Sequence, residues 1–187
     1  YAYTSCVLYG VEGKSYTLDI YYEGQHLSAN TSIPNPVSLL SITPIQSEKE
    51  IEKFLLKARF VDNKYTKDYY KTFVSSSENP LFYLSSFMGN FDDTDFDTDT
   101  VSIPILKGST IYNERFSPLF QKGETVGVKF CHMERCAYLY WNEYEKALTS
   151  SRNPLFSIRK NLPSNIEGGV GYWFGYGTSS YFIDIKE

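Results

Sequence analysis

The chain contains 187 residues, of which 17% are aromatic and 17 are tyrosine, and it carries a formal net charge of −4. This length allows one large domain or two small ones, and the tyrosine and phenylalanine content favours β-strands. The charge argues against a nucleic-acid partner, because no run of Lys or Arg is long enough to follow a phosphate backbone. No apolar stretch approaches the roughly 18 residues that a membrane-spanning helix needs.

Two alternating segments near the start of the chain predict a β-hairpin. Apolar and polar residues alternate over residues 16–22 and again over residues 27–33, which is the pattern of strands with one buried face. Glu23 and Gly24 between them suit a tight turn. We expect residues 1–9 to add a third strand. Since the chain does not begin with Met, we also expect it to be a processed part of a longer protein.

The Pro-Asn-Pro sequence at residues 34–36 interrupts this pattern, because proline cannot donate a backbone hydrogen bond to a strand ladder. We therefore predict a domain boundary between this sequence and Pro44. Residues 1–44 would form a small N-terminal β unit, and residues 45–187 would form a C-terminal β-sandwich domain with one helix. The charged residues 47–53 suggest a short helical turn just after the boundary.

The rest of the chain contains further alternating segments. Residues 54–62 and 69–75 are predicted to pair with each other around a polar loop. Turns are predicted at the two Lys-Gly pairs, residues 107–108 and 122–123. The remaining predicted strands are residues 81–87, 101–106, 125–133, 170–176 and 180–185.

Residues 134–150 form the one segment with helical periodicity. Four apolar residues recur there at spacings of four, three and four, which predicts an amphipathic helix whose aromatic stripe packs on a sheet. These residues are Ala137, Trp141, Tyr144 and Leu148. The predicted fold class is therefore mainly β: an antiparallel β-sandwich with one amphipathic α-helix near residues 134–150.

Three cysteines are too few for a disulfide scaffold. Cys131 and Cys136 enclose His132 and Glu134 in the sequence CHMERC. A zinc site would need closer spacing and further ligands, and only His26 remains elsewhere among the histidines. A local disulfide across a tight corner is a second alternative. Small buried thiols are the interpretation that we favour.

The acidic loop at residues 90–99, with the sequence NFDDTDFDTD, is the best candidate for a bound ion. Its alternate aspartates offer the hard oxygen ligands that calcium prefers, but an EF-hand loop would need glycine at Thr98 and glutamate at Pro104. On a strand the carboxylates would share one face and repel each other unless solvated or bound to metal. A solvated loop is favoured over calcium. The four candidate ligands are Asp93, Asp95, Asp97 and Asp99.

The stretch from residue 153 to residue 180 threads five glycines through a run of aromatic residues. The rings of Tyr172, Trp173 and Tyr176 suit a sugar-stacking platform or a protein-binding patch, although burial in the core is the favoured alternative. Alternation along the segment points Trp173 away from Tyr172 and Phe174, so Trp173 is the expected exposed member.

Signals for catalysis are weak. Only His26 and His132 would serve as a near-neutral base, and no Gly-x-Ser-x-Gly elbow accompanies either. A glycosidase pair depends on the distance between two carboxylates, which sequence leaves open. We therefore predict a protein that is not an enzyme and has no cofactor, with calcium as the one ion to consider.

Motifs along nearly the whole chain resemble those of one family. They are YTLDIYYEGQHLSANTSIPNPV at residues 16–37, FVDNKYTKDYYKTFV at residues 60–74, KGETVGVKF at residues 122–130, NPLF at residues 153–156 and SNIEGGVGYWFGYG at residues 164–177. The last motif is the most specific. In order and spacing they resemble the Bacteroidetes outer-membrane lipoproteins described as domain of unknown function 4249.

This resemblance implies a secreted protein of the outer membrane, on the cell surface or the periplasmic face, with an immunoglobulin-like N-terminal part that residues 1–44 would complete. It implies membrane association only through a lipid anchor outside this chain. Cys6 lies in an expected strand and is not the lipid-bearing cysteine. Such lipoproteins are often encoded beside TonB-dependent transporters, so a transporter is the expected partner. No catalytic or ligand residue is carried over from the family.

Three functions follow as hypotheses. The leading one is a non-enzymatic accessory that binds a partner, or a glycan or peptide ligand, for a TonB-dependent transporter. The alternative is a carbohydrate-binding or adhesion module, which an exposed platform at Trp173 or Tyr176 would favour. A hydrolase is the third, and it would require a concave site with two carboxylates or with His beside Ser.

Overall fold

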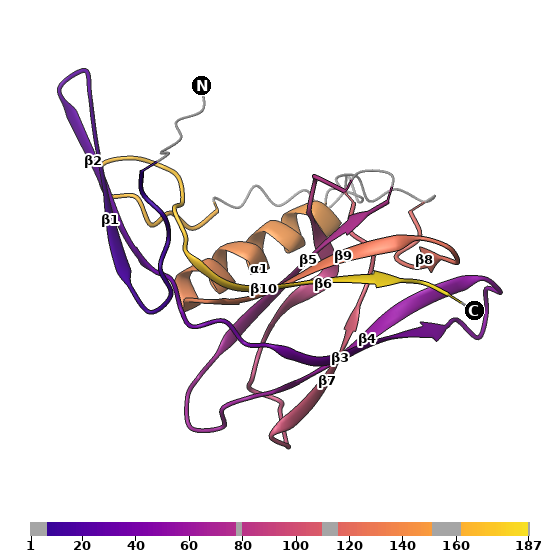
Figure 1. Ribbon diagram of the computed structural model, residues 1–187. Coiled ribbons are helices and arrows are strands. Elements are labelled where there is room, and N and C mark those ends of the chain that lie inside the picture. Colours follow the sequence, from indigo (N-terminus) through magenta and orange to yellow (C-terminus); the bar gives the residue numbers. More distant parts are fainter. Residues whose placement is uncertain (1–6, 78–79, 110–115, 151–161, 187) are drawn as a thin grey trace.

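The computed structural model describes residues 7–77, 80–109, 116–150 and 162–186. In these residues two antiparallel sheets form the layers of a sandwich, one helix covers the outside of one layer, and a separate hairpin projects from one end (Figure 1). The fold is mainly β with one helix, as the sequence predicts. The helix is α1, Arg135–Ser150, and the strands are β1, Ser15–Tyr22; β2, Gln25–Ser32; β3, Leu39–Gln46; β4, Lys53–Val61; β5, Tyr69–Ser76; β6, Leu84–Asp92; β7, Thr100–Ile105; β8, Phe120–Gln121; β9, Thr125–Met133; and β10, Tyr176–Asp184.

The strand order is β10-β9-β5-β6 in the layer that carries the helix and β3-β4-β7 in the other layer, where the short β8 also pairs with β4. Strand β4 shows how the sequence sets these layers. Leu56, Ala58 and Phe60 point inward and are fully buried, whereas Lys57 and Arg59 between them are exposed. Strand β5 is buried on both faces, because the helix covers one face and the opposite sheet covers the other.

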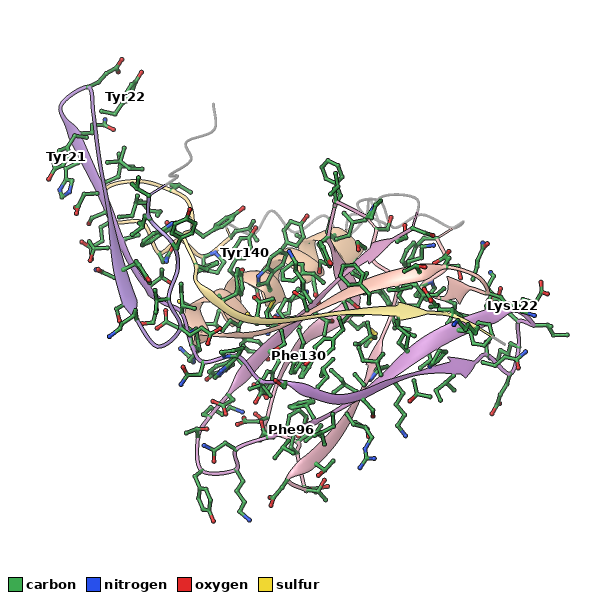
Figure 2. All side chains as sticks on the ribbon, viewed as in Figure 1. Tyr21, Tyr22, Phe96, Lys122, Phe130 and Tyr140 are labelled. Atoms are coloured by element: carbon green, nitrogen blue, oxygen red, sulfur yellow. The ribbon has the colours of Figure 1, made fainter. Side chains whose placement is uncertain are left out.

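Aromatic rings fill the centre of the core between the layers. Phe130 of β9 stacks on Tyr70 of β5 with ring centroids 5.3 Å apart, and Phe60 of β4 meets Phe130 at 4.9 Å. Phe96, from the loop before β7, contacts Phe60 at 6.0 Å. Figure 2 shows Phe96 and Phe130 between the two layers. Such ring pairs contribute about 0.5–1.5 kcal/mol each beyond the burial of their area.

Helix α1 packs on the outer face of the β10-β9-β5-β6 sheet through the stripe that its sequence predicts (Figure 1). Ala137 is fully buried, and the ring of Trp141 meets Phe73 of β5 with centroids 5.3 Å apart. Tyr144 and Leu148 are half-buried farther along the helix. The interpretation of this stripe as core packing is confirmed.

Strands β1 and β2 form a two-stranded sheet that stands away from the sandwich (Figure 1). Their register runs without interruption over the eight residues of each strand. The turn between them has positive φ angles at Glu23 (48°) and Gly24 (78°), as a two-residue type I′ turn requires. The predicted hairpin is therefore confirmed.

The prediction that residues 54–62 and 69–75 pair with each other is wrong. Strand β4 lies in one layer and β5 in the other, and residues 62–68 cross between them. Alternation marks each segment as a strand with a buried face, but it does not say whether the partner lies beside the strand or across the core. Packed sheets are about 10 Å apart, and a loop of this length spans that gap.

Two segments near the hairpin and the first turns differ from expectation. Residues 7–9 are not in a strand, and residues 1–6 lie outside the described part of the chain. Residues 48–52 form bends and a turn instead of a helical turn. The predicted domain boundary at residue 44 falls within β3, whose residues pair with β4 of the sandwich. Residues 33–38 connect the hairpin to that strand.

Among the strands and turns predicted after residue 80, some have the predicted bounds in the structure and others do not. Strand β9 has the predicted bounds, whereas β6 begins three residues later than predicted. The Lys-Gly pair at residues 122–123 forms the predicted turn, with Gly123 at φ 87°. The pair at residues 107–108 does not, because Gly108 bridges to Ser86. In the predicted strand at residues 170–176, only the last residue belongs to a ladder.

Candidate functional site

The glycine-rich residues 164–177, which we call the hairpin seat, lie along β2 with main chain against main chain. The backbone N–H of Ser28 donates to the carbonyl oxygen of Glu167 at 3.1 Å, and the N–H of Glu167 donates to the carbonyl oxygen of Ser28 at 2.8 Å. A Cβ atom at Gly175 would lie 2.5 Å from the carbonyl oxygen of Ser32. Glycine recurs here because two backbones touch. The most specific motif of the chain therefore positions the hairpin.

Asn165 fixes the shape of the hairpin seat. Its side-chain Nδ2 donates to the carbonyl oxygen of Trp173 at 2.7 Å, and its Oδ1 accepts from the N–H of Trp173 at 2.8 Å. The hydroxyl of Ser164 accepts from the N–H of Gly171 at 3.1 Å. These side chains provide partners that a neighbouring strand would otherwise provide. Residues before Tyr176 are consequently held in place without a sheet ladder.

Glu134, between β9 and α1, ties the base of the hairpin to the sandwich. Its Oε2 accepts from the backbone N–H of Ser32 at 2.9 Å and from the hydroxyl of Thr31 at 3.3 Å. The Thr31 hydroxyl oxygen in turn accepts from the N–H of Gly175 at 2.9 Å. Hydrogen bonds to a carboxylate are stronger than neutral ones. The hairpin is thus held at its base by the sandwich and by its seat.

The aromatic candidates Tyr172 and Tyr176 lie on the helix side of the seat. Tyr172 is 47% exposed, and its ring packs on Tyr140 with centroids 3.7 Å apart. Tyr176 is half-buried, and its hydroxyl accepts from Nε1 of Trp141 at 2.8 Å. Burial raises the pKa of Tyr176 to about 12. Tyr176 therefore contributes to packing against the helix.

Trp173 faces away from the helix, as alternation predicts, but it is half-buried instead of exposed. It lines a hollow of about 210 Å³ together with Tyr16 and Ile33 of the hairpin region. The structure thus places the three aromatic candidates on two faces of the seat, and Tyr172 is the most exposed of them.

Two strongly exposed tyrosines that sequence reasoning missed lie at the tip of the hairpin. Tyr21 is 76% exposed and Tyr22 is 64% exposed, and Figure 2 shows both far from the sandwich. The ring of His26 stacks on Tyr21 with centroids 4.5 Å apart, and its Nε2 lies 2.7 Å from Oδ1 of Asp19. Side chains of consecutive strand residues point to opposite faces. Two consecutive tyrosines immediately before a two-residue turn therefore predict one ring on each face of the tip, and this pattern in the sequence could have identified them.

The acidic loop does not gather its own four aspartates. Asp93 instead meets Asp62 and Asp68, from the loop that joins β4 to β5, and their carboxylate oxygens lie within 4.8 Å of one another. The loop has this shape because Phe96 in its middle packs against the core. Residues 93–99 are in no strand, so alternation does not place the four acids on one face. The candidates outside this acidic group are Asp95, Asp97 and Asp99.

Each carboxylate of the acidic group has a donor within the protein. The hydroxyl of Tyr70 donates to Oδ1 of Asp62 at 2.6 Å. The ammonium of Lys67 bonds to Asp93, whose other oxygen accepts from the N–H of Asp68 at 2.8 Å. A calcium ion would have to displace Lys67 from Asp93. The group borders a hollow of about 550 Å³ that also includes Phe96.

Burial raises the pKa of Asp62, and the neighbouring carboxylates of Asp93 and Asp68 raise it further. The hydrogen bond from Tyr70 acts in the opposite direction. Burial and the contact with Asp62 also raise the pKa of Tyr70. Both groups therefore favour their neutral forms in the folded protein more than in water.

His132 joins the acidic group to the segment that leads from the hairpin. Its Nε2 lies 3.3 Å from Oδ1 of Asp68, and its Nδ1 lies 2.8 Å from the carbonyl oxygen of Asn35. His26 lies beside Asp19 on the hairpin. Among the described residues, these ring contacts of the two histidines involve carboxylate and carbonyl oxygens and no serine hydroxyl.

Cys131 and Cys136 are free thiols, so the disulfide alternative is not realised. Cys131 is buried in contact with the hydroxyl of Thr178 at 3.4 Å. Burial raises its pKa to about 11. A buried thiol with this pKa is a poor nucleophile. Cys6 lies outside the described residues.

Comparison with protein families identifies a relationship over almost the whole chain. The model of the family described as Domain of unknown function (DUF4249) matches residues 2–181, and the chain belongs to this family. Comparisons with curated proteins and with solved structures gave no match. In the part of the chain that the structure describes, no helix has the length and apolar character needed to cross a bilayer.

Proposed function

We propose that this member of the DUF4249 family is a non-enzymatic accessory protein that docks onto a TonB-dependent transporter of the outer membrane through its projecting hairpin. The protein would face the cell surface or the periplasm and be lipid-anchored in its full-length form. The partner and the location come from the resemblance of the motifs. The observation that carries the docking role is the pair of exposed tyrosines at the tip, Tyr21 and Tyr22.

The hairpin has the features of a docking element. Exposed aromatic rings grouped on a projection are typical of protein-binding surfaces, because a tyrosine buries a large area and keeps a polar end. Ile20 and Tyr22, on the opposite face from Tyr21, are exposed as well. The hairpin seat and Glu134 hold the base, so little conformational freedom is lost when the tip binds.

The polar groups of the sandwich support a binding role over a catalytic one. Asp62 and Asp93 are engaged by Tyr70 and Lys67, and His132 lies between Asp68 and Asn35. A general base needs a free lone pair directed at substrate. Hydrogen bonds and ion pairs of this kind within the protein are typical of polar groups that stabilise the fold.

The test is co-purification of the transporter from native membranes. The tagged full-length protein and a variant with Tyr21→Ser and Tyr22→Ser are expressed at equal levels, and membranes are solubilised gently. We expect the unsubstituted protein to recover a TonB-dependent transporter in stoichiometric amount, identified by mass spectrometry, and the variant to lose it. Tyr65→Ser is the matched control, because Tyr65 is 86% exposed but lies in the loop between β4 and β5. Recovery of the protein alone would contradict the proposal.

A carbohydrate-binding module is the second candidate, and the exposed ring of Tyr172 favours it. Its plane is within 13° of that of Phe174, with centroids 5.9 Å apart, and Phe174 and Trp173 both line the neighbouring hollow of about 210 Å³. Sugars stack on such rings. Binding on a glycan array that Tyr172→Ala abolishes and Tyr65→Ala retains would support this candidate.

A further inference from the structure

We propose that the docking partner adds an extended, basic segment as a third strand along the free edge of β1. This inference rests on the proposed function, since it specifies how the hairpin holds its partner. Strand addition supplies affinity through main-chain hydrogen bonds and specificity through alternate side chains.

The two-residue turn determines which backbone groups of β1 point outward. In such a hairpin the residues that flank the turn, Tyr22 and Gln25, bond to each other, and bonded pairs then alternate with non-bonded pairs. The N–H and C=O groups of every second residue therefore point away from β2. On β1 these residues are Ser15, Thr17, Asp19 and Tyr21.

Hydrogen bonds at the outer edge of β2 confirm which residues of the hairpin direct their backbone groups outward. Ser28 is opposite Asp19 in the register, and its outward groups exchange hydrogen bonds with Glu167 of the hairpin seat. Ser32 is opposite Ser15, and its outward N–H donates to Glu134. The sandwich and the seat thus provide partners for the outer edge of β2.

The outer edge of β1 has no such cover within the described residues. The side chains of Ser15, Thr17 and Asp19 hydrogen-bond across the hairpin and not outward. Their partners are Ser32, Asn30 and His26. Strand β1 also lacks the proline, lysine or bulge with which proteins protect an edge from pairing. A two-stranded hairpin is marginally stable in water, and a third strand stabilises it.

The charge around the hairpin indicates which kind of partner segment would bind along β1. Among the described residues of the hairpin, the turn before it and the hairpin seat, four acids are exposed, against one exposed lysine, Lys14. A second copy of this chain would bring like charges together, which disfavours pairing of two hairpins. A partner segment in which Lys or Arg alternates with apolar residues is complementary to both the acids and the exposed apolar face. The acids are Glu12, Asp19, Glu23 and Glu167.

Hydrogen exchange on the co-purified complex tests the binding mode. In the free protein we expect slow exchange for the amides of residues 16, 18, 20 and 22, which are bonded to β2, and fast exchange for those of residues 15, 17, 19 and 21. In the complex with the transporter we expect the second set to slow by about tenfold or more. Contact through side chains alone would leave that set fast. This result would overturn strand addition while leaving the accessory role intact, and failure to co-purify the transporter would remove both proposals.

Two variants at one position sharpen the test. Thr17→Pro removes one outward N–H from an edge where proline is tolerated, and we expect it to lose the transporter. Thr17→Val keeps the N–H and removes the same hydroxyl, so it should retain the transporter. Intact folding of both is checked by circular dichroism. If Thr17→Pro unfolds the hairpin, the exchange measurement on the unsubstituted protein still decides the question.

The charge of the partner is tested separately. The variant with Glu12→Gln and Glu23→Gln should recover less transporter than the unsubstituted protein, and added salt should reduce the difference. Glu48→Gln is the matched control, because Glu48 is an exposed acid in the turn between β3 and β4. Equal recovery by all three proteins would contradict a basic partner segment.

Discussion

Gly177 lies directly against the main chain of Pro34. A Cβ atom at position 177 would stand 2.9 Å from the carbonyl carbon of Pro34 and closer still to its oxygen. Gly177 is also the second residue of β10, where it is opposite His132 of β9. Because the atoms that this Cβ would meet belong to the main chain of Pro34 and Asn35, they cannot move aside for a methyl group as a flexible side chain would. The last glycine of the seat therefore sets how closely the hairpin segment approaches the sandwich.

Gly177→Ala should destabilise the protein. We expect the free energy of unfolding to fall by about 1–3 kcal/mol, the usual cost of inserting a methyl group into a closely packed site. Denaturant unfolding followed by tryptophan fluorescence measures this. Gly171→Ala is the control, because its Cβ would be at an ordinary 3.4 Å from Ile166. Equal loss in the two variants would show that the contact with Pro34 is not the cause.

Asp62→Asn should change the pH dependence of stability. The folded-state pKa of Asp62 is raised above its ordinary value of 3.8, chiefly by burial. A carboxyl with a raised pKa is protonated more readily in the folded state, so its stabilising effect is present at acidic pH. That effect is lost as the pH rises through the folded-state pKa. At neutral pH we expect Asp62→Asn to be at least as stable as the unsubstituted protein, since Oδ1 of asparagine still accepts from Tyr70.

The check is a series of unfolding curves from pH 3 to pH 8 on both proteins. The difference in unfolding free energy should shift in favour of the variant as the pH rises. A shift in the opposite direction would mean that Asp62 is stabilised as an anion, as it would be by a bound cation.

Tyr70→Phe should be destabilising although it removes a single oxygen. Tyr70 is fully buried, and its hydroxyl is the donor to the buried Asp62. A buried acceptor left without its hydrogen-bond donor costs about 1–3 kcal/mol. Tyr65→Phe serves as the control, with an expected change within about 0.5 kcal/mol because Tyr65 is at the surface. Thermal or urea unfolding of the two variants would separate these values.

Lys71 and Glu145 form an ion pair beneath helix α1, with no exposure of the lysine side chain. The ammonium also lies 4.8 Å from the centre of the Trp141 ring. Glu145→Gln should lower the free energy of unfolding by about 3 kcal/mol, because it leaves a buried ammonium without its carboxylate. Lys71→Met should cost less, since it removes the buried charge and keeps the volume.

The pH dependence of Glu145→Gln provides a second measurement. Burial lowers the pKa of Lys71 from its ordinary value of 10.5, and Glu145 acts to raise it. A lysine with a lowered pKa costs stability while it is charged, so the cost should shrink as the pH rises toward 10.5. A loss that stayed constant from neutral to alkaline pH would indicate lost packing instead of an uncompensated charge.

Local periodicity was enough to predict the hairpin, β9 and the helix. Each of these elements carries its own pattern, and Glu23 and Gly24 form the turn that their types suggest. The partner of a strand is a long-range property. Because residues 54–62 and 69–75 are close in sequence, they are predicted to pair in one sheet. In the structure they belong to the two different layers and lie on opposite sides of the core.

The acidic group of Asp62, Asp68 and Asp93 also depends on long-range contacts that local sequence patterns do not show. Asp93 was visible as a candidate because it lies in an acidic run, whereas Asp62 and Asp68 are isolated acids in a separate loop. These three acids come together because residues 62–68 connect the two layers beside the acidic loop. Trp173 was expected to be exposed because alternation distinguishes two faces, but the hairpin covers the second face as well.

The hairpin contacts its seat largely through main-chain atoms. The carbonyl oxygens of Ser32 and Pro34 and both backbone groups of Ser28 face the hairpin seat. Backbone atoms are the same whatever side chains the tip carries. The side chains of residues 20–22, 25 and 26 can therefore change without disturbing the attachment, whereas Glu23 and Gly24 are constrained by the positive φ angles of the turn. A different sequence can therefore be grafted onto the two strands of the tip without rebuilding the attachment.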